Sequence, residues 1–440
     1  MFPVYDLSTS EGQAGLEACL DRLRSTASAG TDVAKTVGEI LADVNAHGDK
    51  ALVRYVQRFS DPTFSADRLR VSADDLATAH EKVEPALMDA IRTAIEQVRA
   101  YQQHVMPKPI EAVTIGGAEL GLRFTPVDSV GLHVPGGTAV LFSTLIMLAV
   151  PAMVAGVDPK RISVVHPLPT RRGDEAGATD ISPIVLATAH QLGIERVYRI
   201  GGAEAVAALT YGTDTVEPVD FIAGPGNVYS QLAKAQVNGT VGIDGFYGPS
   251  EIVTIADETA DPVRVGADLI AQAEHDPGKC FLIVWSESVL NAILKQVQQQ
   301  IEQRNRREAI VRAFETESCA VVVRDTAEAV AVANRFAAEH VNLAVADPDA
   351  ILAELRHAGE VFLGDTTPVA AGDYYAGPSH CLPTGTTARF TSGVSVYTFL
   401  KRTGTVAYRK GMPGKAIDHI ARMAEAEGLD GHAHSARVRG

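Results

Sequence analysis

The sequence predicts an α/β protein made of two units, each with a mostly parallel sheet, between a helical N-terminal region and a helical C-terminal tail. The length of 440 residues exceeds the size at which one hydrophobic core keeps growing, so at least two cores are expected. Short apolar runs alternate with helical patterns from about Val130, and a second such series begins near Glu251. This alternation is typical of parallel sheets whose faces are covered by helices.

Helical patterns dominate residues 1–110. Ser72, followed by Asp75, has the form of a variant capping box at a helix start. Pro85 suits the first turn of another helix. Four apolar residues then fall on one face of that helix: Leu87, Ile91, Ile95 and Val98. We therefore expect a helical region ahead of the first sheet.

Residues 111–249 are expected to form the first unit, with strands at 130–134, 162–165, 197–200 and 221–222. The stretch 136–157 has no charged residue and is long enough to span a bilayer. Pro151 interrupts it and a strand follows directly, so we expect a buried helix and no membrane span. The polar, turn-rich stretch 167–183 is expected to be an exposed loop.

Residues 250–386 are expected to form the second unit, with strands at 252–255, 281–284, 320–323, 341–345 and 361–363. Each unit should then be an incomplete, doubly wound, Rossmann-like fold. Residues 387–440 form the expected tail. It should be helical from about Val396, with Gly428 ending its last long helix.

The composition is that of an ordinary folded protein, with 46% hydrophobic and 21% charged residues. A net charge of -15 opposes non-specific binding to nucleic acid and to anionic lipid. The four cysteines are far apart and lack CxxC spacing, so reduced thiols in a cytoplasm are expected. No basic region followed by an apolar run opens the chain, so no secretory signal is expected. These totals favour a cytoplasmic enzyme that acts on a small molecule.

Two short segments contain side chains suited to metal binding or acid–base chemistry. Gln272 and His275 are three residues apart at the end of a predicted helix, where both could grip one ion. A solvated helix end is the simpler explanation of that pair alone. Glu339 and His340 join a predicted helix to a predicted strand, and such a pair can activate water and accept a proton near neutral pH. An ordinary surface turn is the plainer alternative.

A loop rich in Gly and Pro carries Asp373 and His380 just after the strand at 361–363. Loops at strand ends are where α/β sheets assemble ligand sites. A turn in which Asp373 caps backbone amides explains the same residues equally well. Glu427 and His432 follow a predicted helix and indicate little by themselves.

Three glycine turns, 135–138, 201–204 and 224–227, each follow a predicted strand. Glycine at such turns lets backbone amides approach a phosphate closely. None of the three has the GxGxxG pattern of a dinucleotide site. Tight turns without a ligand therefore stay an open alternative.

Taken together, these segments resemble the histidinol dehydrogenase family, in the family's order, from Val130 to His432. The segments that carry the resemblance are Val134–Gly137, Gly201–Ala203, Gly224–Asn227, Gly248–Glu251, Gln272–His275, Glu339–His340, Gly372–Tyr374, Gly377–His380 and Glu427–His432. The resemblance implies a two-step, NAD-dependent oxidation of histidinol through histidinal to histidine, the last step of histidine biosynthesis.

The resemblance also implies one zinc ion per subunit that orients the substrate. Its ligands would be Gln272, His275, Asp373 and His432. The same four residues would contact the substrate, together with Ser250, Glu339, His380 and Glu427. In the family the active site is shared between the two subunits of a homodimer, so Glu427 and His432 would act on the partner's site.

For the chemistry, the resemblance makes His340 the general base for the hydroxyl and Glu339 the residue that activates water on the aldehyde. It places His133, Glu204 and Asn227 beside NAD. The family commonly has Tyr at position 133 and Gln at position 204. Glu204 would bring negative charge near a pyrophosphate, which puts the affinity for the cofactor in question.

Three rival interpretations are considered. A relative on the same scaffold could oxidise another polar alcohol, such as a sulfonated diol. A non-catalytic zinc-binding protein is a second rival, and the retention of Glu339 and His340 argues against it. Thiol catalysis by Cys381, beside His380, is a third. A buried Cys381 would be inert, and the apolar residues that follow it favour burial.

Overall fold

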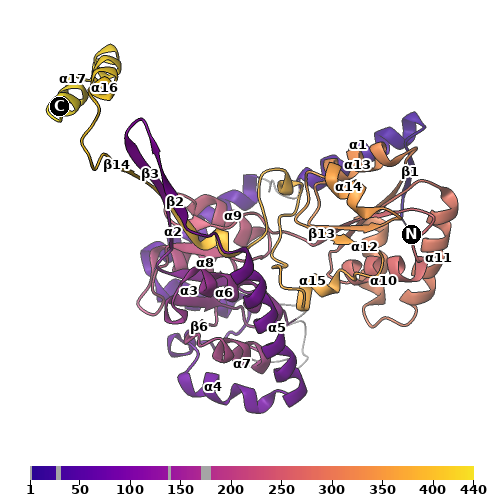
Figure 1. Cartoon of the computed structure of the whole chain (residues 1–440). Helices are drawn as coiled ribbons and strands as arrows, with labels where there is room; N and C mark the ends of the chain where they lie inside the picture. Colours follow the sequence, from indigo (N-terminus) through magenta and orange to yellow (C-terminus); the bar gives the residue numbers. More distant parts are fainter. Residues whose placement is uncertain (1, 26–30, 137–139, 170–179) are drawn as a thin grey trace.

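The structure is a computed structural model that describes residues 2–25, 31–136, 140–169 and 180–440. Two parallel sheets form two lobes, and the C-terminal tail stands away from both (Figure 1). The predicted α/β class is therefore confirmed. Gly137 and Thr138 of the first glycine turn, and much of the loop predicted at 167–183, lie outside the described residues.

The first sheet consists of parallel strands in the order β6-β5-β4-β7-β8. Their bounds are β4 (Val130–His133), β5 (Ile162–Val165), β6 (Arg196–Tyr198), β7 (Phe221–Ala223) and β8 (Gly242–Ile243). The chain moves outward from β4 to β6 and then crosses to the other side of β4 with β7. Ligands of open α/β sheets bind at the carboxyl ends of the strands, beside such a reversal.

Helix α6 (Phe142–Ala155) crosses the first lobe and is buried along nearly all its length, as expected for the uncharged stretch. Pro151 lies inside it. No helix in the described part of the chain is long and apolar enough to cross a membrane. The other helices of this lobe's α/β unit are α7 (Pro183–Gln191), α8 (Gly202–Tyr211) and α9 (Val228–Val237).

Most of the helical N-terminal region packs on the first lobe. It comprises α2 (Thr31–His47), α3 (Asp49–Phe59), α4 (Ala73–Thr78) and α5 (Pro85–Val105). Ser72 caps α4 by accepting a hydrogen bond from the Asp75 amide, as predicted. The prediction for α5 was wrong at Leu87, which is exposed. Met88 takes the buried position instead, because it falls in the helical stripe of Ile91 and Ile95.

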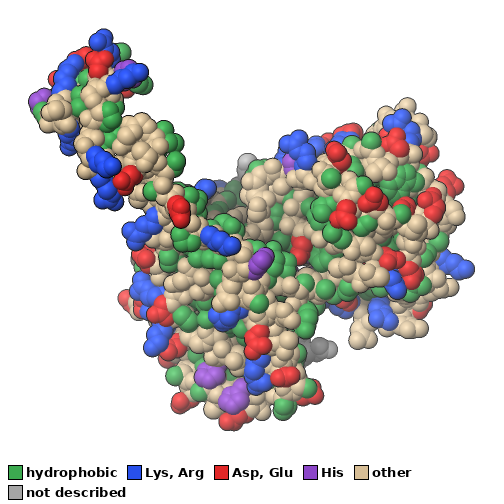
Figure 2. All heavy atoms as spheres, in the orientation of Figure 1, with side chains coloured by type: hydrophobic (Ala, Val, Ile, Leu, Met, Phe, Trp, Pro, Cys, Tyr) green, Lys and Arg blue, Asp and Glu red, His purple; other side chains and the backbone are tan. Residues whose placement is uncertain are grey.

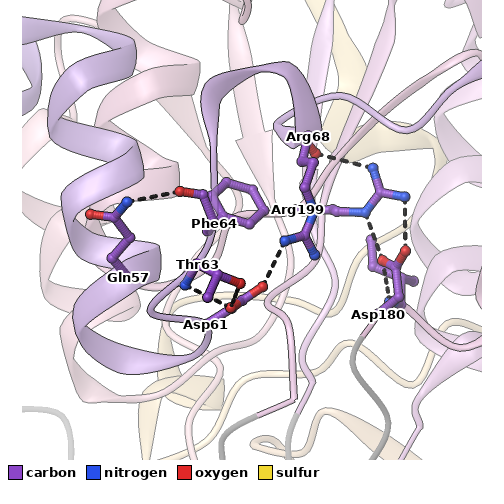
Figure 3. Close-up of polar contacts among 8 residues, drawn as sticks. Gln57, Asp61, Thr63, Phe64, Arg68, Asp180 and Arg199 are labelled. Atoms are coloured by element: carbon purple, nitrogen blue, oxygen red, sulfur yellow. Dashed lines mark hydrogen bonds and ion pairs between the residues drawn. The ribbon is translucent and has the colours of Figure 1, made fainter.

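The buried side chain of Arg199, just after β6, ties this region to the first sheet (Figure 3). Its guanidinium donates to both carboxylate oxygens of Asp180, at 2.6 and 3.0 Å. It also donates to the carbonyl oxygens of Arg68 and Arg70. Such bidentate, charge-assisted bonds are among the stronger ones in proteins. They fix the edge of the sheet beside the glycine turn at 201–204.

The second sheet is also parallel, in the order β1-β11-β10-β9-β12-β13. Its strands are β1 (Val4–Asp6), β9 (Glu251–Ala256), β10 (Lys279–Val284), β11 (Cys319–Val322), β12 (His340–Ala344) and β13 (Glu360–Leu363). Its helices are α10 (Pro262–Ala273), α11 (Glu287–Ile301), α12 (Arg307–Thr316), α13 (Thr326–Phe336), α14 (Pro348–Glu354) and α15 (Ala370–Tyr374). The strand order reverses between β9 and β12.

The first residues of the chain belong to this second lobe, which the sequence did not predict. Strand β1 extends the sheet beside β11, and α1 (Ser10–Ser25) buries Leu16, Leu20 and Leu23 in the core of the lobe. A three-residue strand is too short to give a recognisable period. Its assignment depends on a partner more than 300 residues away.

A third, antiparallel sheet joins the tail to the first lobe, in the order β14-β3-β2. Its strands are β2 (Ile110–Ile115), β3 (Ala118–Pro126) and β14 (Leu400–Ala407). The prediction of a tail that is helical from Val396 was therefore wrong over β14, whose side chains are mostly exposed and lack a clear apolar alternation. Beyond it lie α16 (Gly414–Ala426) and α17 (Asp430–Arg437). Gly428, with φ 76°, follows α16 as predicted.

Candidate active site

A cleft of about 550 Å³ lies between the two lobes. From the first lobe it is lined by residues at the reversal between β4 and β7, including Pro135, Pro225, Gly226 and Asn227. From the second lobe it is lined by Ser250, His275, Glu339, His340, Asp373 and His380. The structure thus brings six of the predicted site residues of the second lobe into one cleft with a glycine turn of the first lobe.

The second lobe presents the amino edge of its sheet to the cleft, opposite to the usual edge. Glu251 begins β9 and His340 begins β12, the two strands between which the order reverses. Helices that follow parallel strands run back to this amino edge. The end of α10 therefore delivers His275, and the end of α13 delivers Glu339.

Glu339 and His340 are both buried, with 5% and 2% of their surfaces exposed, which excludes the surface-turn alternative. The backbone N–H of Glu251 donates to Glu339 Oε2 at 2.8 Å. The carbonyl oxygen of Glu251 lies 3.1 Å from His340 Nδ1, which therefore carries the proton and donates. His340 Nε2 has no hydrogen-bond partner among the described residues. The ring thus has a lone pair available in a buried, cleft-lining position.

Burial controls the protonation of both side chains. It lowers the pKa of His340 below its ordinary value, although the nearby Asp373 carboxylate opposes the shift. It raises the pKa of Glu339 well above its ordinary value, and the charges of Glu251 and Asp373 add to the effect. Burial therefore favours the neutral form of both the imidazole and the carboxyl.

His380 lines the cleft and contacts both lobes. Its Nδ1 lies 3.0 Å from the carbonyl oxygen of Asp373, and its Nε2 lies 3.1 Å from the hydroxyl of Thr144 on α6. The first contact makes Nδ1 the donor, so Nε2 accepts from Thr144. Thr144 was not predicted as a site residue, because a hydroxyl within an apolar helix gives no sequence signal.

Two of the four proposed metal ligands, His275 and Asp373, line the cleft. Gln272 lies behind them in the last turn of α10, buried, and its Nε2 has no partner among the described residues. The prediction that the helix reaches His275 was wrong, because α10 ends at Ala273 and His275 lies in the following turn. His275 Nδ1 contacts the Gln272 carbonyl oxygen at 3.2 Å, which leaves Nε2 for a ligand.

The fourth predicted ligand, His432, lies away from the cleft. His432 lies on α17 and is exposed, as is Glu427 after α16, and neither lines the cleft. Within the described residues, no group of three or more His, Cys, Asp or Glu side chains is close enough to hold a metal ion. An imidazole, a carboxylate and an amide oxygen suit a zinc ion chemically, and the fourth predicted ligand, His432, does not lie with them.

The glycine turn at 224–227 is held by a buried ion pair. Lys234 Nζ lies 2.6 Å from Asp244 Oδ1, and both side chains are almost completely buried. Lys234 also donates to the Gly224 carbonyl oxygen, while Asp244 Oδ2 accepts from the Gly224 amide. Gly224 has φ 124°, and a Cβ there would overlap the carbonyl oxygen of His133. The close approach of β4 and the turn thus requires glycine.

The three predicted cofactor residues differ in position. Asn227 lines the cleft and caps α9 by accepting from the Ser230 amide. His133 does not line it: Nδ1 contacts the Pro225 carbonyl oxygen at 2.8 Å and Nε2 contacts the Ser230 hydroxyl at 3.2 Å. Its burial lowers the pKa to about 4, so the ring is neutral and holds the turn. Glu204 lies in the first turn of α8, outside the cleft lining.

The two sheets and the cleft define the class of this protein. It is an α/β enzyme in which a glycine turn at the strand reversal of one sheet faces a buried carboxylate and imidazole on the other. A chain with these features is suited to hold an extended cofactor against a small polar substrate.

Comparison with known proteins gives the family. The family model described as histidinol dehydrogenase matches residues 23–440. A histidinol dehydrogenase of Synechococcus sp. is 43% identical over 98% of this chain and 97% of its own length. One from Rhodospirillum rubrum is 44% identical over 93% of this chain and 92% of its own.

Solved structures agree with the family model. The crystal structure of histidinol dehydrogenase from Elizabethkingia anophelis superimposes with a TM-score of 0.88 at 32% identity, covering 100% of this chain and 98% of that one. The chain therefore belongs to the histidinol dehydrogenase family and is an oxidoreductase that acts on an alcohol.

Proposed function

We propose that this enzyme oxidises histidinol through histidinal to histidine with two molecules of NAD, at a site completed by a zinc ion and by the tail of a second subunit. The observation that carries the proposal is the single cleft that joins Glu339 and His340 to the glycine turn at 224–227. A nicotinamide seated along that cleft would face a substrate held at the buried pair.

The first step removes a hydride from the carbinol carbon and a proton from its hydroxyl. His340 Nε2 is suited to accept the proton, because the Glu251 carbonyl fixes the proton of the ring on Nδ1. The low pKa of the buried ring keeps the base form present at neutral pH. NAD bound along the cleft would accept the hydride, and the aldehyde would stay in the cleft.

The second step adds water to the aldehyde and removes a second hydride from the hydrate. Glu339 is the candidate that takes a proton from the attacking water. Its raised pKa means that it must first lose its own proton. The bond from the Glu251 amide stabilises the carboxylate form that results. A cation bound in the cleft would shift the same equilibrium towards the carboxylate.

Gln272, His275 and Asp373 would hold the zinc ion, with His432 of a second copy as a fourth ligand. The ion would orient the amino alcohol and neutralise charge when bound. Ser250 and His380 line the same end of the cleft and are candidates to contact the substrate, and Glu427 would reach it from the second copy.

A homodimer is proposed because the two tail helices bury only a small apolar cluster and leave other apolar side chains exposed. Helices α16 and α17 bury a small cluster of alanines against each other, Ala421, Ala424 and Ala433. Figure 2 shows hydrophobic side chains at the surface of this separate tail. Met423 is 69% exposed and Val438 is 60% exposed. Burying them on a partner would also bring the exposed Glu427 and His432 to a protein surface.

Thiol catalysis is the weaker candidate. Cys381 lines the cleft but is 2% exposed, and burial raises the pKa of its thiol. The thiolate that would attack an aldehyde is therefore scarce.

The direct test is reduction of NAD by the purified, zinc-loaded enzyme. Histidinol should give faster turnover than a sulfonated diol. Preference for the diol would favour the relative on the same scaffold, and no turnover with zinc bound would favour a binding protein.

A further inference from the structure

Glu251 contacts two separate segments of the site, although no role has been given to its side chain. It begins β9, between β10 and β12, and is completely buried. Its backbone N–H and carbonyl oxygen bond Glu339 and His340, as described above. These two bonds involve only the backbone of Glu251.

The side chain makes a different contact. Glu251 Oε1 accepts a hydrogen bond of 2.9 Å from the Gly385 amide, at the end of the loop 375–386. This loop carries His380, which lines the cleft. The loop is also fixed at Thr384, whose hydroxyl accepts from the Gly248 amide at 2.7 Å. The segment 248–251 therefore carries one end of the loop.

The environment of the Glu251 carboxyl is unfavourable for its charged form. Glu251 Oε2 has no hydrogen-bond partner among the described residues. Burial raises the pKa of this carboxyl to about 7, against the opposing charge of Lys279, its register neighbour on β10. An unpaired buried oxygen destabilises the fold, and the bond from the Gly385 amide to Oε1 is a contact that an apolar side chain could not make.

We propose that Glu251 is a positioning residue that docks the loop 375–386, and with it His380, at a fixed distance from Glu339 and His340. The inference rests on the proposed function for the identity of the substrate. The docking itself follows from the hydrogen bond to Gly385.

The backbone and the side chain of Glu251 make different contacts, so replacing the side chain has a specific expected effect on the kinetics. Substituting the side chain leaves its backbone bonds to Glu339 and His340 in place. Glu251→Ala should therefore raise KM for histidinol about tenfold, the effect of losing one hydrogen bond to a charged group, and change kcat by less than about threefold. Glu251→Gln keeps an oxygen acceptor for Gly385 and should restore KM to within about threefold of the native value.

Two further variants separate positioning from general destabilisation. Asp257→Ala removes another carboxyl that accepts from a loop amide, Ala346 at 2.9 Å, but Asp257 follows the opposite end of β9 and does not line the cleft. It should lower stability and leave KM unchanged. Glu251→Asp keeps the charge but is one methylene shorter. It should raise KM as Glu251→Ala does, and it serves if the alanine variant fails to fold.

Hydrogen exchange of the peptide that contains Gly385 gives a readout that does not depend on the substrate. The amide should exchange faster in Glu251→Ala and Glu251→Asp than in the native enzyme or Glu251→Gln. Unchanged exchange and KM in those two variants would overturn the proposal, and so would a glutamine variant as impaired as alanine. A native enzyme inactive on histidinol would instead refute the proposed substrate and leave the exchange result standing.

Discussion

His340 Nδ1 lies 3.1 Å from the carbonyl oxygen of Glu251, so a backbone group decides which nitrogen of the imidazole carries its proton. The other nitrogen, Nε2, is left as a buried lone pair. Carboxylates lie somewhat farther from the ring, with Glu339 Oε2 3.5 Å from Nδ1 and Asp373 Oδ1 4.0 Å from Nε2.

Replacing His340 tests this arrangement. His340→Ala should lower kcat for histidinol by roughly 10² to 10⁴, the usual contribution of a positioned general base, because it removes the Nε2 lone pair proposed to take the hydroxyl proton. Steady-state NADH formation measures the loss. His340→Gln is the polar control and should be equally slow. Native-like kcat in either variant would remove His340 from the chemistry.

The carboxyl of Glu204 should make binding of NAD depend on pH. Burial raises its pKa to about 7, so it is neutral below that pH and charged above it. The charge would lie in the first turn of α8, beside the glycine turn at 201–204, and repel a pyrophosphate. KM for NAD should therefore rise as the pH increases through about 7 in the native enzyme. Glu204→Gln, neutral at every pH, should abolish the rise; the same rise in this variant would exclude Glu204 as its cause.

The buried pair of Lys234 and Asp244 should make a large contribution to stability at the glycine turn 224–227. Lys234→Met leaves Asp244 charged and unpaired, and breaking a buried pair in this way costs roughly 3–5 kcal/mol of the free energy of unfolding. Urea denaturation measures it. Lys160, exposed and 4.0 Å from Glu195, provides the matched control, and Lys160→Met should cost less than about 1 kcal/mol. Equal losses of unfolding free energy in the two variants would show that the buried pair contributes no more to stability than the exposed pair.

Mixing two inactive variants tests whether the tail acts on a second subunit. His340→Ala damages the body of the site and His432→Ala damages the tail. After subunit exchange, half of the dimers are mixed and each mixed dimer has one intact site, so about a quarter of native activity should return. Native mass spectrometry confirms the exchange. Exchange without recovery would place His432 in the site of its own chain or outside any site.

The sequence predicted the two parallel sheets because apolar runs of strand length recur with helical patterns between them. It did not predict β1 or β14, since one is three residues long and the other is mostly exposed. Their assignment depends on partners distant in the chain, β11 and β3. The local sequence pattern does not indicate pairings between strands so distant in the chain.

The candidate site shows the same limit. Resemblance to the family points to Glu339 and His340, whereas the local sequence is equally compatible with a surface turn. Their burial depends on the packing of the whole lobe. Glu251 lies within a segment that carries the resemblance, yet nothing in the sequence separates its backbone role from its side-chain role. His133 was expected to contact NAD, and its two ring nitrogens are instead engaged within the first lobe.

The most direct test of separate roles for Glu339 and His340 is the number of NADH molecules formed per histidinol consumed by Glu339→Gln. Gln keeps the oxygen that accepts from the Glu251 amide but cannot take a proton from water. The native enzyme should give two NADH per histidinol. The variant should give one, with histidinal recoverable by a carbonyl-trapping reagent. Two NADH per histidinol at the native rate in Glu339→Gln would contradict the assignment of water activation to Glu339.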